Sequence, residues 1–283
     1  MNSVFDNPSQ SSPAKGGVNR IDQKFSLLKI KNKKALILYM TAGDPSLQKN
    51  RALIYALEAE GVDLIELGVP FSDPLADGPV IQAASQRALK KHTNLPKILG
   101  LVETVRKKSN IPILLMSYLN PLLSYGYEAF AAAAQKSGVD GLIIPDLPPD
   151  EGRIIASLMC RHGIHLVYLA APTSTKKRLK LIARSSKGFV YYVSVTGITG
   201  TRRSLPLDLD SHIQALKKMS PLPVCVGFGV STPEQAKKIS KLSDGVIIGS
   251  AVVKALALNP GMNAFKFSKK YVRPFVKALE KKS

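Results

Sequence analysis

Residues 63–80 read DLIELGVPFSDPLADGPV, and this stretch sets the pattern that organises the rest of the chain. Within it, Leu64 to Pro70 is a short apolar run that ends in turn residues. The run predicts a strand, because it is too short for a helix and too apolar for a loop. Side chains alternate between the two faces of a strand, so Glu66 lies opposite Ile65 and points into whatever the sheet encloses.

Two acids in this stretch are candidates for chemistry. Burial of the Glu66 carboxylate is costly unless the group is neutral, hydrogen-bonded or matched by a ligand, so Glu66 needs either a function or an interior salt bridge. Asp77 lies near the far end of the loop from Phe71 to Gly78. The residue after this loop, Pro79, suits the first turn of a helix. Asp is also a common helix cap, so capping explains Asp77 equally well.

Short apolar runs alternate with longer amphipathic segments, as in a parallel sheet with crossover helices. The eight runs are Ala35 to Thr41, Asp63 to Val69, Ile111 to Tyr118, Gly141 to Pro145, His165 to Ala170, Phe189 to Val195, Pro223 to Phe228 and Gly245 to Ile248. The helical candidates are Ser46 to Glu60, Pro79 to Lys90, Pro96 to Lys108, Tyr127 to Lys136, Pro149 to Arg161, Thr175 to Ser185, Asp208 to Met219, Thr232 to Ser240 and Asn263 to Lys281. This pattern predicts one α/β domain, a single (β/α)8 TIM barrel over residues 18–283, with an open doubly wound sheet as the alternative. Residues 1–17 are polar and are expected to form a disordered extension.

Glycine-bearing turns follow the last three predicted strands. They lie at Thr196 to Gly200, Gly227 to Ser231 and Gly249 to Ala251. In a barrel these turns share the catalytic end, where backbone N–H groups and a helix N-terminus can hold a phosphate. The three turns together predict a phosphorylated substrate, although any one glycine could serve backbone geometry alone.

Composition narrows the class of protein. The chain has 283 residues, of which 45% are hydrophobic, and no apolar run reaches the length that a membrane span requires. Two cysteines without metal or redox spacing suit a reducing cytosol, so a cytoplasmic location is expected. Four scattered histidines form no ligand pattern, and we expect no metal site.

The formal net charge of +20 is not explained by the predicted barrel with a phosphorylated substrate. It raises the alternative of a surface that binds nucleic acid or another polyanion. No motif with interleaved aromatic residues accompanies the charge, so solvated surface charge is the favoured interpretation and nucleic-acid binding is not expected.

Seven motifs together carry a family resemblance. They are YMTAGDP at residues 39–45, DLIELGVPFSDPLADGP at 63–79, LLMSYLNP at 114–121, GLIIPDLP at 141–148, SVTGITG at 194–200, VGFGVS at 226–231 and GVIIGSAVV at 245–253. In this order and spacing, the chain resembles the tryptophan synthase α subunit family from about Lys24 to the C-terminus.

The resemblance implies a carbon–carbon lyase that cleaves indole-3-glycerol phosphate to indole and glyceraldehyde 3-phosphate. It further implies an α2β2 heterotetramer, in which indole passes to a β subunit that carries pyridoxal phosphate, with no cofactor on this chain. Glu66 would protonate the indole C3 carbon and then take the proton of the glyceryl hydroxyl. Asp77 would accept the ring N–H. We expect a raised pKa for Glu66 and an ionised Asp77 on a solvated loop.

The same resemblance assigns further residues. Neighbours of the indole ring or of the acids are Tyr39, Tyr118, Tyr191 and Phe228. Ligands of the substrate phosphate are Gly200, Gly229, Gly249 and Ser250. Thr199 would belong to a lid that meets Asp77, and Asp146 would lie near the contact with the β subunit. Asp146 is equally well explained as a helix cap, and each aromatic residue as core.

Two other functions keep the barrel. One is a ring-closing enzyme of the same pathway, such as indole-glycerol-phosphate synthase, which relies on a catalytic lysine at a strand end; the predicted strands here carry no interior lysine. The other is a catalytically weak subunit that activates its partner, against which the presence of both Glu66 and Asp77 argues.

Overall fold

The computed structural model describes residues 18–193, 209–227 and 229–280, and residues 1–17 of the predicted extension lie outside them. The described strands form one parallel sheet in the order β5-β4-β3-β2-β1-β9-β8-β7-β6. They are β1 (Ala35–Thr41), β2 (Leu64–Gly68), β3 (Ile113–Met116), β4 (Gly141–Ile143), β5 (His165–Val167), β6 (Leu169–Ala170), β7 (Val190–Val193), β8 (Val224–Gly227) and β9 (Gly245–Ile248).

The two ends of this sheet meet at Tyr168. Strands β5 and β6 are one segment interrupted at that residue, with β5 paired to β4 and β6 paired to β7. The Tyr168 carbonyl accepts a hydrogen bond from the Tyr191 N–H, which continues the pairing across the interruption. The ring is therefore closed, which confirms the predicted TIM barrel and excludes the open sheet.

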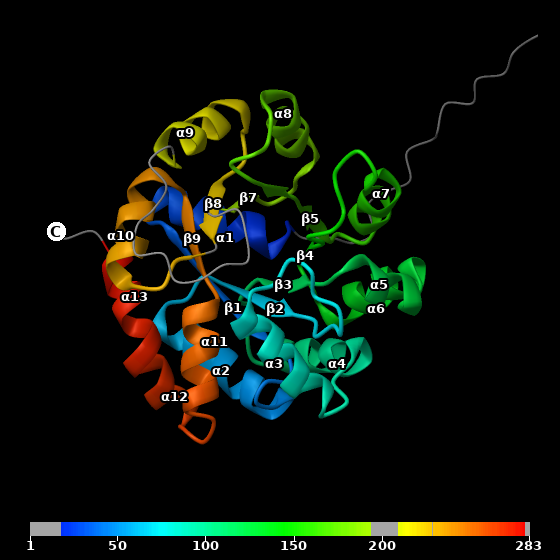
Figure 1. The fold of residues 1–283 in the computed structure, drawn as a ribbon, viewed down its shortest axis with the longest axis vertical. Helices are drawn as coiled ribbons and strands as arrows, with labels where there is room; N and C mark the ends of the chain where they lie inside the picture. Colours follow the sequence, from blue (N-terminus) through cyan, green and yellow to red (C-terminus); the bar gives the residue numbers. More distant parts are fainter. Residues whose placement is uncertain (1–17, 194–208, 228, 281–283) are drawn as a thin grey trace, which may run out of the picture.

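Helices surround the ring of strands (Figure 1). They are α1 (Arg20–Ile30), α2 (Leu47–Glu60), α3 (Pro79–Leu89), α4 (Leu95–Arg106), α5 (Leu119–Tyr125), α6 (Tyr127–Ser137), α7 (Arg153–Arg161), α8 (Lys176–Ser185), α9 (Leu209–Met219), α10 (Pro233–Leu242), α11 (Ser250–Leu258), α12 (Ala264–Phe267), η1 (Ser268–Val272) and α13 (Arg273–Leu279). Helices α1, α5 and α11 were not predicted, and α7 begins four residues later than expected because residues 149–152 form turns.

Alternation along the strands separates two hydrophobic cores. Leu36, Leu38 and their equivalents face the outer helices, whereas Ile37 and Leu64 belong to the core inside the ring. Glu66 follows Leu64 at the strand period of two and is 1% exposed, while its neighbours in sequence face outward. The predicted interior position of Glu66 is thus confirmed.

Helix α1 closes the end of the barrel at which the strands begin. Its buried residues Ile21 and Phe25 pack with the interior core, and the Phe25 and Phe189 rings lie 5.7 Å apart. Asn19 caps the helix and also donates a hydrogen bond to the Asp140 carbonyl, immediately before β4. The opposite end of the barrel therefore remains the open one.

Three aspartates at the closed end share one hydrogen-bonding pattern. Asp63, Asp140 and Asp244 each directly precede a strand. The N–H of each bonds a carbonyl on the adjacent strand, and the side-chain carboxylate accepts the N–H of that same residue at 2.8–3.0 Å. Each aspartate thus pins the register of two neighbouring strands.

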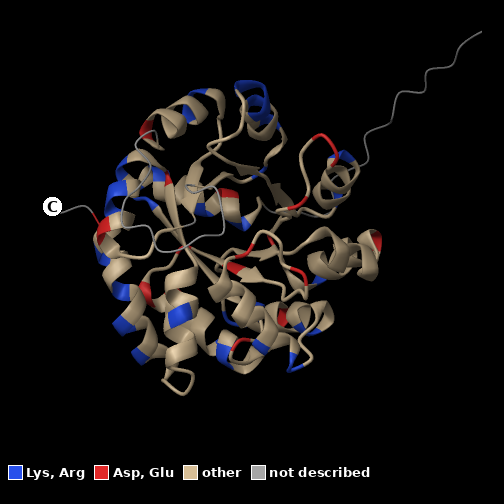
Figure 2. Cartoon of the chain, in the orientation of Figure 1, with Lys and Arg blue, Asp and Glu red and all other residues tan. Residues whose placement is uncertain are grey.

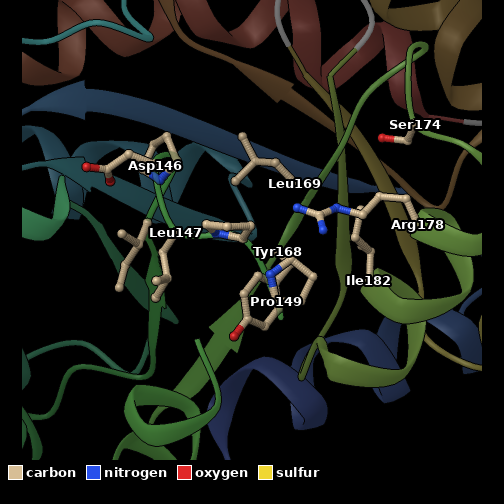
Figure 3. A pocket seen from close by; sticks show the side chains of 11 residues that line it. Asp146, Leu147, Pro149, Tyr168, Leu169, Ser174, Arg178 and Ile182 are labelled. Atoms are coloured by element: carbon tan, nitrogen blue, oxygen red, sulfur yellow. The ribbon is translucent and has the colours of Figure 1, made fainter. Parts of the chain in front are cut away.

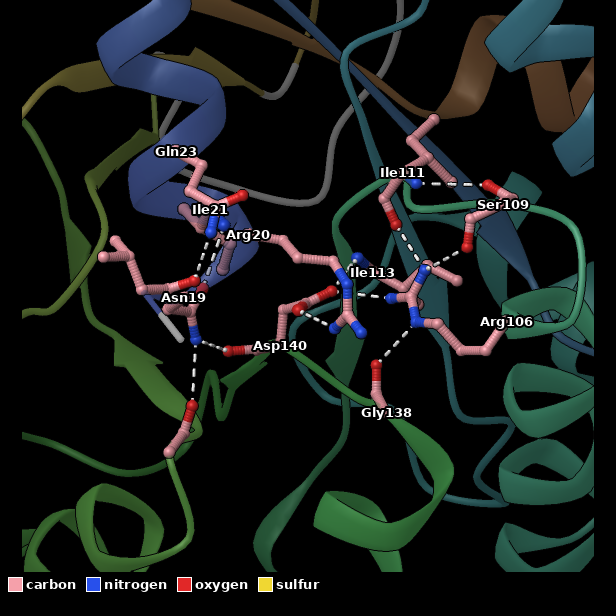
Figure 4. Close-up of polar contacts among 12 residues, drawn as sticks. Asn19, Arg20, Ile21, Gln23, Arg106, Ser109, Ile111, Ile113, Gly138 and Asp140 are labelled. Atoms are coloured by element: carbon pink, nitrogen blue, oxygen red, sulfur yellow. Dashed lines mark hydrogen bonds and ion pairs between the residues drawn. The ribbon is translucent and has the colours of Figure 1, made fainter. Parts of the chain in front are cut away.

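Asp140 is the most buried of the three, at 3% exposure. Its carboxylate pairs with Arg20 at 2.7 Å and with Arg106 at 2.6 Å (Figure 4). Arg106 also donates to the carbonyls of Gly138 and Ile111. Burial lowers the pKa of the Arg106 guanidinium to about 10, so it remains charged at neutral pH and compensates Asp140.

The basic residues lie mainly on the outer helices (Figure 2). Lys176, Lys177 and Lys180 on α8 are exposed, as are Lys237 and Lys241 on α10. Within the described part of the chain, none of the helices has the length and apolar character to cross a bilayer.

We predict that Asp140→Ala lowers the free energy of unfolding by about 3 kcal/mol, because it leaves Arg106 buried without its partner. Asp150→Ala is the matched control. It removes an ion pair to Arg178 of the same 2.6 Å length, but Asp150 is 56% exposed. The control should cost less than about 1 kcal/mol. Urea unfolding followed by circular dichroism measures both, and equal losses would contradict the role of burial.

Candidate active site

Glu66 lies on β2 inside the open half of the barrel. Its strand neighbours in register are Tyr39 on β1 and Leu114 on β3. The Glu66 Oε1 atom is buried and has no hydrogen-bond partner among the described residues. Burial, together with the nearby Asp77 charge, raises the pKa of Glu66 to about 8. The direction agrees with the prediction, and Glu66 holds a proton at neutral pH.

Asp77 is buried, and the expected solvated loop position is wrong. The residue is 9% exposed, and burial raises its pKa to about 6, against a hydrogen bond from the Tyr118 hydroxyl that lowers it. Asp77 is therefore still largely ionised at neutral pH. It also does not cap α3, whose N-cap is Gly78 without a side-chain hydrogen bond.

Tyr118 holds the loop that carries Asp77. Its hydroxyl accepts a hydrogen bond from the Ala76 N–H at 2.9 Å, and its ring lies 5.5 Å from that of Phe71 at the start of the loop. Burial and the nearby Asp77 charge raise the pKa of the Tyr118 phenol. The loop thus folds back over the barrel mouth and brings Asp77 near Glu66.

Two further tyrosines complete the wall around the acids. Tyr39 on β1 and Tyr191 on β7 are buried, at 7% and 4% exposure. Burial and the charges of Glu66 and Asp77 raise the pKa of both phenols, so both stay neutral. The structure therefore brings Tyr39, Tyr118 and Tyr191 together with the acid pair, as predicted from the motifs.

Glycines make room for these rings. A Cβ atom built on Gly68 would lie 2.0 Å from the Tyr39 hydroxyl oxygen, and one on Gly227 would lie 2.5 Å from that of Tyr191. The Tyr39 hydroxyl meets the Thr41 hydroxyl at 3.3 Å. Gly68 and Thr41 were not among the predicted site residues. The sequence did carry a signal for them: Gly68 lies two residues after Glu66, and Thr41 lies two residues after Tyr39, so each shares the interior face of its strand.

The predicted phosphate ligands that the structure describes lie at the same end of the barrel. Gly229 follows β8 with a φ of 77°, a value that favours glycine. Gly249 is the N-cap of α11, and Ser250 is its first residue. Gly249 also lies against Tyr39, since a Cβ there would be 3.4 Å from the Tyr39 Cβ. The predicted residues Thr199, Gly200 and Phe228 lie outside the described residues.

Asp146 lies after β4 and is exposed. Both of its carboxylate oxygens accept the Leu119 N–H, at 3.1 and 3.2 Å. The capping interpretation is thus confirmed, but the capped helix is α5 of the preceding βα unit. A contact of Asp146 with a partner subunit stays a prediction.

A cavity of about 250 Å³ lies beside Asp146 and is lined by Leu169, Arg178 and Ile182 among others (Figure 3). Neither Glu66 nor Asp77 lines it, so it is separate from the acid pair. No cluster of potential metal ligands occurs among the described residues.

We predict that Gly68→Ala destabilises the chain by about 1 to 3 kcal/mol, because the added methyl group overlaps the Tyr39 phenol. Gly100→Ala on α4 is the control, since a Cβ there meets nothing within 4 Å and alanine favours helix. Thermal unfolding compares the two variants. A Gly68→Ala protein as stable as the parent would show that Tyr39 does not occupy this space.

We predict that Glu66→Gln is more stable than the parent at pH 8. The parent Glu66 binds its proton more tightly when folded, with a pKa of about 8 against the ordinary 4.5, so its stability falls as the pH rises between these values. Glutamine carries no such charge. The advantage of the variant should grow from pH 5 to pH 8, to more than about 1 kcal/mol, and then level off. Denaturant unfolding at several pH values tests this, and a constant difference would contradict it.

Comparisons with known proteins agree with this geometry. The family model described as tryptophan synthase alpha chain matches residues 25–281. The tryptophan synthase alpha chain of Thermoanaerobacter sp. (strain X514) is 46% identical over 263 residues, which cover 93% of this chain and 99% of that one. That of Geotalea daltonii is 49% identical over 237 residues, covering 84% and 90%.

Solved structures give the same result. The tryptophan synthase alpha chain of Legionella pneumophila superposes with a TM-score of 0.85 at 36% identity, covering 93% of this chain and 98% of that one. A chain from the tryptophan synthase a2b2 complex of Pyrococcus furiosus superposes with a TM-score of 0.80 at 40% identity, covering 87% and 99%. The chain belongs to the tryptophan synthase alpha chain family.

Proposed function

We propose that the chain is a lyase that cleaves indole-3-glycerol phosphate to indole and glyceraldehyde 3-phosphate in tryptophan biosynthesis. The observation that carries this is a pair of buried carboxylates in one barrel mouth, Glu66 protonated and Asp77 ionised at neutral pH. Family membership supports the substrate. The reaction needs one group that delivers a proton to the indole ring and another that stabilises the positive charge on the ring nitrogen. The two acids meet both needs.

The proposed steps balance in protons and electrons. Protonated Glu66 gives its proton to the indole C3 carbon, and the ring nitrogen then carries positive charge with its N–H bonded to the Asp77 carboxylate. Ionised Glu66 next takes the proton of the glyceryl hydroxyl. The electron pair of the bond between C3 and the side chain returns to the ring, which releases indole, and the former alcohol carbon becomes the aldehyde of glyceraldehyde 3-phosphate.

The surroundings of Glu66 suit this two-way role. Its unpartnered Oε1 atom is free to approach a substrate carbon, and no ion pair among the described residues fixes its charge. Because the Asp77 charge raises the pKa of Glu66, the two carboxylates are coupled. Neutralisation of Asp77 by the substrate N–H would make Glu66 a stronger acid at the moment when it protonates C3.

The remaining residues serve binding in this proposal. Gly200, Gly229, Gly249 and Ser250 hold the phosphate through backbone N–H groups and the N-terminus of α11. Tyr39, Tyr118, Tyr191 and Phe228 enclose the indole ring.

The partner in this proposal is a β subunit in an α2β2 assembly, as in the Pyrococcus furiosus complex. Indole passes to that subunit, which carries pyridoxal phosphate, while this chain works without a cofactor. Asp146 lies near the contact, and the assembly is cytoplasmic. Cleavage is favoured over ring closure because the described strands contain no lysine.

We predict that Glu66→Gln and Asp77→Asn each lower kcat for indole release by about 10² to 10⁴, with little change in substrate affinity. The parent should show a bell-shaped pH profile. Activity rises as Asp77 ionises near pH 6 and falls as Glu66 loses its proton near pH 8. A colorimetric indole assay on the full chain, alone and with the β subunit, measures both effects. Near-normal turnover of either variant would remove that residue from the mechanism.

A further inference from the structure

Helix α5 begins without a cap of its own. Its N-cap position is Tyr118, whose side chain makes no capping hydrogen bond. Ser, Thr, Asp or Asn usually occupies this position and bonds the first free N–H groups of the helix. Tyr118 does not do so, because its hydroxyl accepts the N–H of Ala76 in another loop.

Asp146 supplies the missing cap from another loop. Its two carboxylate oxygens accept the N–H of Leu119, the first residue of α5, at 3.1 and 3.2 Å. The two residues are 27 positions apart in sequence. Because Leu119 directly follows Tyr118, this bond fixes the backbone from which the Tyr118 side chain projects.

A continuous chain of contacts therefore runs from the surface to the acid pair. Asp146 holds the Leu119 N–H, Tyr118 is the preceding residue on the same backbone, and the Tyr118 hydroxyl accepts the N–H of Ala76, the residue next to Asp77. The Phe71 ring packs on Tyr118 at the other end of the same loop. Displacement of Tyr118 would move both ends of the loop relative to Glu66.

We infer that Asp146 is a positioning residue for the cleavage reaction: by capping α5 it sets the place of the Tyr118 hydroxyl, which in turn fixes Asp77 at the barrel mouth. This inference rests on the proposed function for its kinetic consequence. It gives Asp146 a role within this chain, in addition to any contact with a partner subunit.

The variants separate capping from charge. Asp146→Ala removes both the acceptor and the charge, whereas Asp146→Asn keeps an acceptor oxygen and loses the charge. Asp150→Ala removes a carboxylate from the same loop region, whose ion pair among the described residues is with Arg178. We expect kcat to fall about tenfold in Asp146→Ala and less than about twofold in the other two, because a small misplacement of a reacting group is costly.

The pH profile gives a readout that a general loss of stability would not move. Among the described residues, the titratable groups that surround Asp77 are Glu66 on β2, Tyr39 on β1, Tyr191 on β7 and Tyr118 after β3. Loosening of Tyr118 removes the bond that lowers the Asp77 pKa, so the acid limb of the profile should move to higher pH in Asp146→Ala. Loss of a negative charge alone would move it to lower pH.

A double variant tests the route. If Asp146 acts through Tyr118, Asp146→Ala should add less than about twofold to the loss in a Tyr118→Phe background. A tenfold loss in both backgrounds, or an acid limb that moves to lower pH in Asp146→Ala, would overturn the inference.

Hydrogen exchange tests the positioning role of Asp146 without a measurement of catalysis. Protection of the Ala76 N–H should fall in Asp146→Ala and persist in Asp146→Asn and Asp150→Ala. If the parent chain released no indole with or without the β subunit, the proposed function would be wrong. The exchange pattern would still test whether Asp146 positions the loop. Unchanged protection in Asp146→Ala would sink the positioning role alone.

Discussion

The constraint on which the site depends is a buried carboxyl oxygen, Glu66 Oε1, that has no hydrogen-bond partner among the described residues. Glu66 can remain there only because it is neutral at ordinary pH, and its surroundings of apolar and phenolic side chains keep it so. The interior salt bridge that could have explained Glu66 structurally does not occur among the described residues. Burial inside the closed ring is the main cause of the raised pKa of Glu66.

The acidic residues at the two ends of the barrel have different surroundings. At the closed end, Asp63, Asp140 and Asp244 pair with cations and with strand N–H groups, and they stabilise the register. At the open end, Glu66 and Asp77 have no cation partner among the described residues, and the Asp77 charge adds to burial in raising the pKa of Glu66. Acidic residues with cation partners thus stabilise the barrel, whereas in the proposed function the two without such partners carry out the chemistry.

Local periodicity predicted the strands and the inward direction of Glu66, because both depend on alternation within one segment. The burial of Asp77 could not be found this way, since the Ala76 to Tyr118 bond that folds its loop back joins residues 42 positions apart. Helix α5 was missed for a similar reason: it has only seven residues, and its cap comes from Asp146. The three aspartates at strand starts were visible in the sequence, but their shared bonding pattern needs the neighbouring strand.

The charge of the whole chain complements this local arrangement. Two acids at the barrel mouth disfavour the approach of a phosphate, and among the described residues the start of α11, beside Gly249 and Ser250, offers compensating partial positive charge. The net charge of +20, carried largely by the outer helices, adds a long-range positive potential that attracts anions toward the molecule. Lysines on the barrel wall would attract a phosphate more directly, but they would also lower the pKa of Glu66 and remove its proton. A basic outer surface and an acidic barrel interior are therefore compatible with each other in the proposed reaction.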